Sequence, residues 1–251
     1  MPAELHSDEQ RWLLDVARQV SSPPPVDVLA LALGFGIRVV RARKSPRERR
    51  RGELVDRDGQ LVIRVLMADT SRRATRTDRF TIAHELGHAL LMKRFSLHQP
   101  LSRAGYWKHE GWCDDFAGHL LVPDDALAAY AVDRAAESIL EIADACEVTP
   151  EPAALRLATA QPNLTIVALR HSVANASNIV VKWAAPRDVE GLHRASYIPS
   201  SSPLGQAFLQ RPMGTEAKSP IRGTWRTPLE YIAVVARNEV PYLIAGTRNQ
   251  T

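Results

Sequence analysis

The chain has 251 residues, of which 45% are hydrophobic and 24% charged, and its formal net charge is +4. This ordinary globular composition allows one large domain or two to three small ones. No apolar run reaches the roughly 18 residues that a membrane-spanning helix needs, and the acidic N-terminus does not resemble a signal peptide, so we expect no membrane contact. Because the two cysteines, Cys113 and Cys146, lack a CxxC partner, a reducing, cytoplasmic setting is favoured over a disulfide scaffold.

The first region, residues 1–125, is expected to open with a helix over residues 7–20, which three consecutive prolines end. A short helix, a glycine-rich turn and a strand follow it. The sequence GELVDRDGQLVIRVL then predicts a β-hairpin with an Asp-Gly turn. Two long helices complete the region, one around FTIAHELGHALL at residues 80–91 and one around HEGWCDDFAGHLLV, which ends before Pro123.

Between the strand and the hairpin lies a cluster of basic residues around a single acid, Glu48. The cluster consists of Arg41, Arg43, Lys44, Arg47, Arg49, Arg50 and Arg51. Such a run is most often a solvated loop. The alternative is a surface that attracts an acidic partner or a nucleic acid backbone. No aromatic residues interleave with these arginines, so base stacking is not indicated.

The stretch His84-Glu85-Leu86-Gly87-His88 carries the chemistry. Histidines four residues apart lie on the same helix face, about one turn apart, so both imidazoles can reach one metal ion. Glu85 is offset around the helix and can serve as the general base in metal-assisted hydrolysis. Gly87 costs about 1 kcal/mol relative to alanine in a helix, and one reason to tolerate it is space for substrate or a neighbouring element.

A metal site needs a third protein ligand, and the second long helix offers one. Glu110 is the expected third ligand. Asp114, one turn later, can accept the second ring N–H of a ligand histidine and so fix its tautomer. Cys113 could be a thiolate ligand, but its position beside Glu110 favours helix packing. Rival ligands are His98, His109 and His119.

Two histidines and one carboxylate suit Zn²⁺, and they also suit Mn²⁺ or Fe²⁺. The residues therefore predict a metal-dependent hydrolase without fixing the metal. The group that stabilises the transition state is left open between Tyr106, Tyr130 and His109. The alternative function is a metal-containing DNA-binding or sensor-type transcriptional regulator without protease activity.

The second region, residues 126–160, is rich in alanine and leucine and predicts two short helices with a tight turn, similar to a helix-turn-helix. Thr149 and Pro150 suit the cap and the first position of the second helix. That helix, PEPAALRLATA, has Arg156 as its only basic residue, and its start is acidic and proline-bearing. A helix that reads base edges needs polar or basic residues, so we do not expect direct DNA binding.

The third region, residues 161–251, changes to β-branched runs bounded by Pro, Gly, Asn and Ser, which predicts an α+β module. Four aromatic residues could line a pocket for a small molecule, although aromatic residues more often fill a core. They are Trp183, Tyr197, Trp225 and Tyr231. No motif in this region indicates a ligand. Taken together, the three regions predict an α+β chain.

Two segments resemble the ImmA/IrrE family of bacterial metallopeptidases. They are RFTIAHELGHALL at residues 79–91 and the pattern E-x-x-C-D-x-F-A-x-x-L-L-V-P at residues 110–123. The order of the regions is also similar to that of a family member that controls the radiation response in Deinococcus. That protein has a peptidase domain, then a helix-turn-helix-like domain, then a GAF-like domain.

The resemblance implies a gluzincin-like fold in which His84, His88 and Glu110 hold Zn²⁺ and Glu85 activates water. It implies that the substrate is a helix-turn-helix transcriptional repressor, cut once so that a DNA-damage or mobile-element response is switched on. Asp114 stands where the family also has asparagine, a difference that leaves the metal ligands unchanged.

Overall fold

The computed structural model of the protein contains two compact units. The first consists of residues 1–128 and 143–149, and the second of residues 129–142 and 150–251. The structure describes residues 8–48, 50–67, 69–70, 74–95, 103–129, 135–161, 164–171, 175, 178–185, 197–201, 209, 216–221, 229–237 and 240–248. Within these ranges, no helix combines the length and the apolar character needed to cross a membrane.

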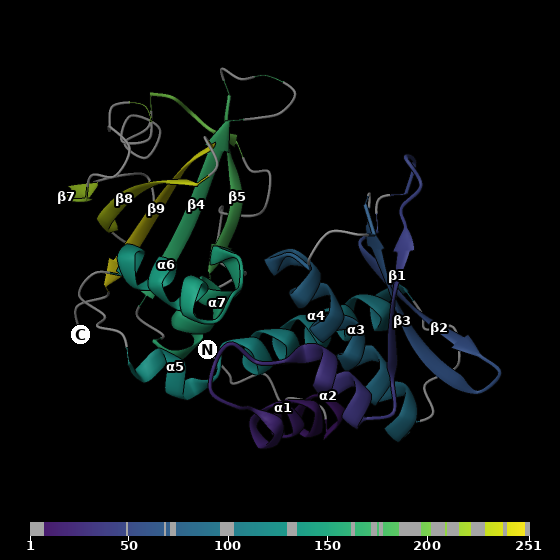
Figure 1. Ribbon diagram of the computed structural model, residues 1–251. Coiled ribbons are helices and arrows are strands. Elements are labelled where there is room, and N and C mark those ends of the chain that lie inside the picture. The colour runs from purple at the N-terminus through teal and green to yellow at the C-terminus, as the bar shows by residue number, and fades with distance from the viewer. Residues whose placement is uncertain are drawn as a thin grey trace. The chain divides into compact units, whose positions relative to one another are not determined.

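The first unit combines helices with a small sheet (Figure 1). In chain order its elements are α1 (Asp8–Val20), α2 (Val28–Gly34), β1 (Arg38–Arg43), β2 (Gly52–Arg57), β3 (Gln60–Met67), α3 (Arg76–Phe95), α4 (Arg103–Leu121) and α5 (Asp124–Ala128). This order confirms the helices, the strand and the hairpin expected from the sequence. The hairpin turn consists of Asp58 and Gly59, whose φ angles of 55° and 81° explain why an Asp-Gly pair is found there.

The strand order in this sheet is β1-β3-β2, with β1 parallel and β2 antiparallel to β3. Strand β2 is therefore at one edge, and in the described part of the chain it pairs with β3 alone. Gly52 stands opposite Val65, and the neighbouring Arg51 carbonyl accepts a hydrogen bond from Leu66 N at 2.8 Å. Because hydrogen-bonded and non-hydrogen-bonded pairs alternate along an antiparallel ladder, the backbone groups of Gly52 and Leu54 face away from β3.

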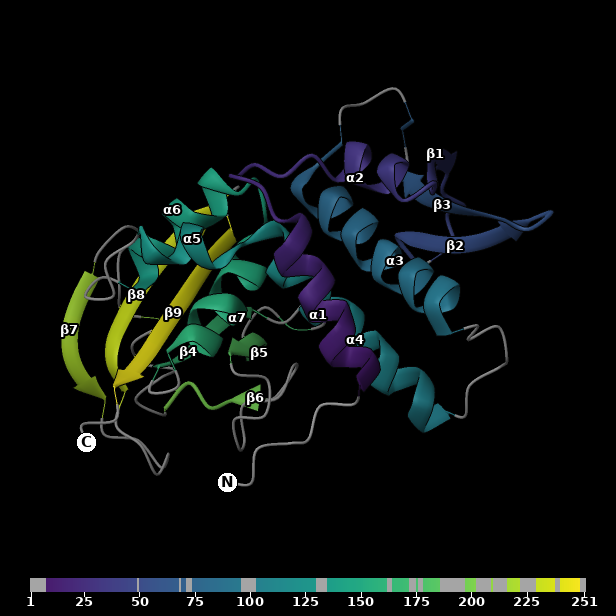
Figure 2. The same cartoon turned by 90° about the horizontal axis from the view of Figure 1, so that it is seen from below.

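Helices α3 and α4 pack side by side, and α1 packs against both of them (Figure 2). The core between them is apolar, and it includes the fully buried Leu86, Phe116 and Leu120. At the crossing stands Gly87, where an added Cβ would lie 3.2 Å from Cys113 Sγ and 3.3 Å from Cys113 Cα. The missing side chain therefore allows the close approach of the two helices.

Replacing Gly87 by alanine is expected to destabilise the protein. The new methyl group would lie 3.1 Å from Phe116 Cδ1 and against the α4 backbone, and overpacking of this kind outweighs the gain in helix propensity. We expect the free energy of unfolding to fall by about 1–2 kcal/mol in chemical denaturation. The control is Gly111→Ala on α4. An added Cβ there meets no atom within 4 Å, so this variant should raise the free energy of unfolding by up to about 1 kcal/mol. Equal stability of the two variants would contradict the tight crossing.

The first turns of α3 are anchored to residues 143–149 of the same unit. Arg76 donates hydrogen bonds to the carbonyls of Ala143 and Val148, both at 3.2 Å, and pairs with Asp144 at 2.7 Å. Arg79 donates to the Val26 carbonyl at 2.9 Å. These bonds fix the start of the helix that carries both histidines.

The second unit contains helix α6 (Ala135–Ala145) up to residue 142, helix α7 (Pro150–Ala160) and a six-stranded sheet of order β6-β5-β4-β9-β8-β7. Its strands are β4 (Leu164–His171), β5 (Ile179–Ala185), β6 (Tyr197–Ile198), β7 (Glu216–Ile221), β8 (Leu229–Arg237) and β9 (Val240–Arg248). The observed pairs are antiparallel, and α7 packs on β4 and β5. The mixed α+β class expected from the sequence is confirmed.

The aromatic residues of the third region do not form a described pocket. Trp183 is 6% exposed and belongs to the core, whereas Tyr197 is 56% exposed. Trp225 and the side chain of Tyr231 lie outside the described residues. A ligand site built from these four residues stays a prediction.

Candidate metal centre

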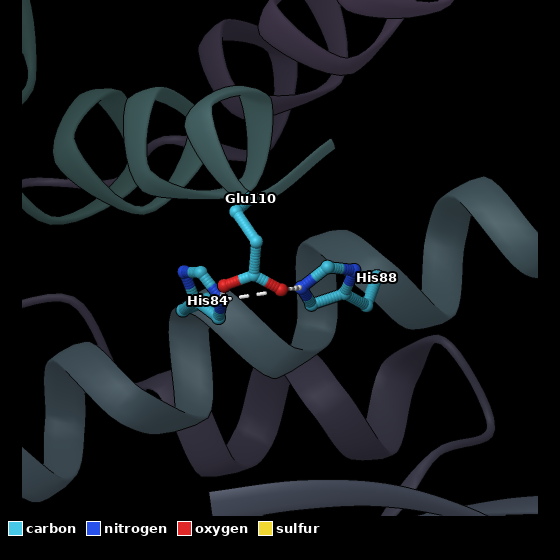
Figure 3. Close-up of side chains that lie close together, drawn as sticks. All are labelled: His84, His88 and Glu110. Atoms are coloured by element: carbon cyan, nitrogen blue, oxygen red, sulfur yellow. Dashed lines mark hydrogen bonds and ion pairs between the residues drawn. The ribbon is translucent and has the colours of Figure 1, made fainter. Parts of the chain in front are cut away.

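The structure brings His84, His88 and Glu110 together between α3 and α4. Figure 3 shows both imidazoles on one helix and the Glu110 carboxylate between them. Glu110 Oε1 lies 3.1 Å from His88 Nε2, and Glu110 Oε2 lies 3.4 Å from His84 Nε2. One ligand atom from each residue can be chosen so that all three lie within 4.8 Å of one another. This spacing fits three ligands of one ion.

Local sequence explains the convergence. The four-residue spacing puts the two Nε2 atoms 3.1 Å apart on a part-buried face of α3. On α4, Glu110 stands one turn before Cys113, whose Sγ occupies the space beside Gly87. Because the helices are in close contact at that level, the Glu110 side chain reaches the histidines.

Asp114 orients the first histidine. Its Oδ1 lies 2.9 Å from His84 Nδ1, so the Nδ1–H donates to the carboxylate and Nε2 is the ring nitrogen that faces Glu110 and His88. Burial lowers the pKa of His84, but the hydrogen bonds with Asp114 and Glu110 outweigh it and raise that pKa to about 9. Hydrogen bonds with His84 and His88 hold the pKa of the Glu110 carboxyl well below its usual range.

The donor set fits a divalent cation. Two ring nitrogens and a carboxylate oxygen point at one place, an arrangement that leaves lone pairs facing one another unless a positive charge lies between them. In the metal-free protein a proton on His84 supplies part of that charge, because hydrogen bonds with Asp114 and Glu110 favour the charged ring and raise its pKa. A bound ion would supply it instead.

Replacing Asp114 by alanine is expected to weaken metal binding without removing a ligand. Loss of the carboxylate frees the His84 ring to rotate and to take the wrong tautomer, and losses of this kind cost about 10- to 100-fold in affinity. Competition against a chromogenic chelator would measure the change. Asp114→Asn can still accept the Nδ1–H bond and should lose less, and equal affinities for wild type and Asp114→Ala would contradict the orienting role.

Glu85 lies beside the triad and outside it. Burial raises the pKa of its carboxyl, and the charges of His88 and His84 lower it in part. Strand β2 passes very close to it, because an added Cβ on Gly52 would overlap Thr81 Cγ2 and lie 3.3 Å from Glu85 Cγ. The base candidate therefore stands between the three candidate metal ligands and an edge strand.

His84, Glu85, His88 and Glu110 line one cavity of about 450 Å³. Its walls are residues 50–54, the α3 face that carries Phe80, His84, Glu85, His88 and Met92, and Glu110 of α4. The sequence does not connect the basic cluster to this site, yet Arg50 and Arg51 belong to the cavity wall. The cavity is large enough for several side chains of a peptide.

The other candidates are not part of the triad in the described residues. His109 stacks on Trp112 with ring centroids 4.8 Å apart, and neither it nor His119 is grouped with the two ligand histidines. Cys113 is fully buried, and burial raises the pKa of its thiol well above the usual range, which suits packing. His98, Tyr130 and the side chain of Tyr106 lie outside the described residues.

Comparison with known proteins gives the family. A family model described as the IrrE N-terminal-like domain matches residues 33–158, half of the chain, and this range includes both motif helices. The structure is similar to that of a Mycobacterium tuberculosis transcriptional regulator, with a TM-score of 0.58 and 16% identity over 97% of this chain and 77% of that chain. At this identity the similarity concerns the fold alone. No curated protein matches the sequence.

Proposed function

Because the chain belongs to the ImmA/IrrE family of metallopeptidases, we propose that it is a metal-dependent endopeptidase that cleaves a helix-turn-helix transcriptional repressor. A single cut would inactivate the repressor and induce a stress response, such as that to DNA damage, or a mobile-element response. The observation that carries this proposal is the convergence of His84, His88 and Glu110 beside Glu85 in one open cavity.

The metal ion would be held by the Nε2 atoms of His84 and His88 and by the Glu110 carboxylate. Zn²⁺ is the proposed ion, and Mn²⁺ or Fe²⁺ also suits this set. When bound, the ion would supply Lewis-acid chemistry, which polarises a carbonyl and increases the acidity of water. The Asp114 carboxylate would keep the His84 lone pair aimed at the ion.

Glu85 would act as the general base. Its carboxyl takes the proton of the attacking water molecule and then gives it to the leaving amine. Burial raises its pKa, which suits a group that must accept and release a proton near neutral pH. Glu85 stays free for this role because Glu110, and not Glu85, completes the triad.

The edge strand β2 would align the substrate. The backbone groups of Gly52 and Leu54 face away from β3, and both residues line the cavity that contains Glu85. An extended peptide can pair with such an edge through its own backbone groups. Gly52 lets the strand lie close to Glu85, so the paired peptide would pass the base and the metal ligands.

For the rest of the chain, we propose the domain limits 1–125, 126–160 and 161–251, with helix-turn-helix-like and GAF-like folds for the last two. The two helices α6 and α7 would either dock the substrate protein or contribute to the packing of the fold. Direct DNA reading is not expected, because α7 packs on β4 and β5 and its only basic residue, Arg156, is 4% exposed. A cytoplasmic location fits the two free, buried cysteines.

The alternative is a metal-containing transcriptional regulator without protease activity. The similar Mycobacterium tuberculosis structure is named a transcriptional regulator, and this name is the reason to consider the alternative function. Gel shifts with random duplex DNA at low salt distinguish the two functions. Tight, salt-sensitive binding would support the regulator, and its absence would support the peptidase.

Co-incubation with the helix-turn-helix repressor encoded beside the gene tests the proposed function. The purified chain with Zn²⁺ or Mn²⁺ is expected to produce one discrete cut, which a chelator prevents. Peptide assays alone are insufficient, because an open site that cuts one protein takes its selectivity from docking. No cut with any metal, in a chain that binds one ion, would count against this substrate.

A further inference from the structure

We propose that the cavity prefers substrates with an acidic residue close to the scissile bond, and that Arg51 binds that carboxylate. This inference rests on the proposed function and names the chemical class of the segment that the site accepts. It begins from two residues of the basic cluster, Arg50 and Arg51, which line the same cavity as His84, His88 and Glu85.

Chain geometry puts Arg51 next to the base. It directly precedes Gly52, so the two Cα atoms are about 3.8 Å apart. At Gly52 an added Cβ would lie 3.3 Å from the Glu85 carboxylate oxygen Oε1. An arginine side chain that starts one residue from this contact can reach a substrate residue that flanks the bond under attack.

The charges that line the cavity are neutralised, with one exception. The Glu53 carboxylate is paired with Arg64, and a bound metal ion would offset the charges of Glu85 and Glu110, which line the same cavity. Arg50 Nε lies 3.5 Å from Glu48 Oε1, and Arg50 Nη1 lies 3.8 Å from Glu53 Oε2, so the Arg50 guanidinium is paired with two carboxylates.

Arg51 is exposed and has no side-chain partner within the part of the chain that the structure describes. With the metal bound, its guanidinium is therefore the surplus positive charge of the cavity. A planar guanidinium can donate two parallel hydrogen bonds to one carboxylate, which makes aspartate or glutamate the side chain that it binds best.

A peptide fits this charge better than a nucleic acid does. A phosphate backbone carries one negative charge per nucleotide, more than the single surplus charge of Arg51 can match. A single carboxylate on a peptide can reach Arg51 while the remainder of the segment meets the metal ligands. The cavity of about 450 Å³ also suits side chains and not a duplex.

The test measures binding without cleavage. The Zn²⁺-loaded full chain with Glu85→Gln is titrated into a fluorescent alanine- and leucine-rich peptide with one central glutamate, and into the same peptide with glutamine. We expect the glutamate peptide to bind about threefold to fivefold more tightly at low salt, as for one exposed ion pair. Adding Arg51→Glu should remove or reverse this preference. Adding Arg57→Glu should retain it, because Arg57 is on the same strand outside the cavity wall.

Equal or undetectable binding of both peptides would overturn the inference, and so would a preference that survives Arg51→Glu. A fluorescent duplex in the same assay covers the other class of partner. If Arg51→Glu weakens duplex binding and leaves the peptide preference unchanged, the arginine serves nucleic acid and the inference fails. Cleavage by the wild-type chain separates the two proposals: cleavage without an acidic preference refutes only this inference. An acidic preference without any cleavage refutes only the peptidase.

Discussion

Replacing Glu85 by glutamine is expected to lower the rate of repressor cleavage by about a hundredfold to ten-thousandfold, the usual contribution of a positioned proton-transfer group. Glutamine has nearly the same shape as glutamate, but it cannot take a proton from water. Metal content should not change, because Glu85 is outside the group formed by His84, His88 and Glu110.

Two measurements on the same preparation check this prediction. Single-turnover cleavage of the repressor gives the rate, and elemental analysis gives the number of metal ions per chain. The control is Asp15→Asn, an equivalent change of carboxylate to amide at an exposed residue of α1, which should cut at the wild-type rate. A Glu85→Gln variant that cuts normally would rule out the general-base role, and one that has lost its metal would place Glu85 among the ligands.

The part of the site that the sequence predicts is the part set by local geometry. His84 and His88 are held in register by one helix, so their spacing alone implies that both rings reach one point. Glu110 and Asp114 depend on how two helices cross. That crossing is still indicated by small residues, since Gly87 and Cys113 lie against each other where α3 and α4 pack.

The cavity wall depends on contacts between residues distant in sequence, and the sequence does not reveal it. Gly52 reads as the start of a hairpin, but in the structure it lies against Thr81 and Glu85 on α3. The residue pattern of a strand does not predict which helix its glycine will contact. For the same reason, the charge pattern around Arg50 and Arg51 indicates a solvated loop and does not show that both residues line the cavity.

Strand order in the second unit depends in the same way on pairing over long separations. β4 pairs with its chain neighbour β5, as alternating patterns suggest, but its other neighbour is β9. Likewise, α7 reads as half of a helix-turn-helix, because a short alanine-rich helix has the same pattern in many settings. Its buried face, which packs on β4 and β5, depends on a sheet that follows it in the chain.

Replacing Glu110 by glutamine is expected to abolish the stabilisation that metal gives to the first unit. An ion that binds only the folded state at a hundred times its Kd stabilises by about 2.7 kcal/mol. For a chain of this size, that corresponds to about 5–10 °C in Tm. Glutamine keeps the shape of Glu110 but removes the charged oxygens that lie 3.1 Å from His88 and 3.4 Å from His84, so binding should weaken too far for the shift to persist.

Thermal unfolding with Zn²⁺ and with chelator measures this shift in wild type, in Glu110→Gln and in the Asp15→Asn control. Wild type and control should show the full shift, and Glu110→Gln should show almost none. Its metal-free Tm should be lower than that of wild type, because glutamine cannot form the charge-assisted hydrogen bonds of Glu110 with His84 and His88, so each shift is taken from the variant's own metal-free Tm. A full shift in Glu110→Gln would mean that another group is the third ligand, and His109 would then be the first to replace, since it stands one residue before Glu110 on α4.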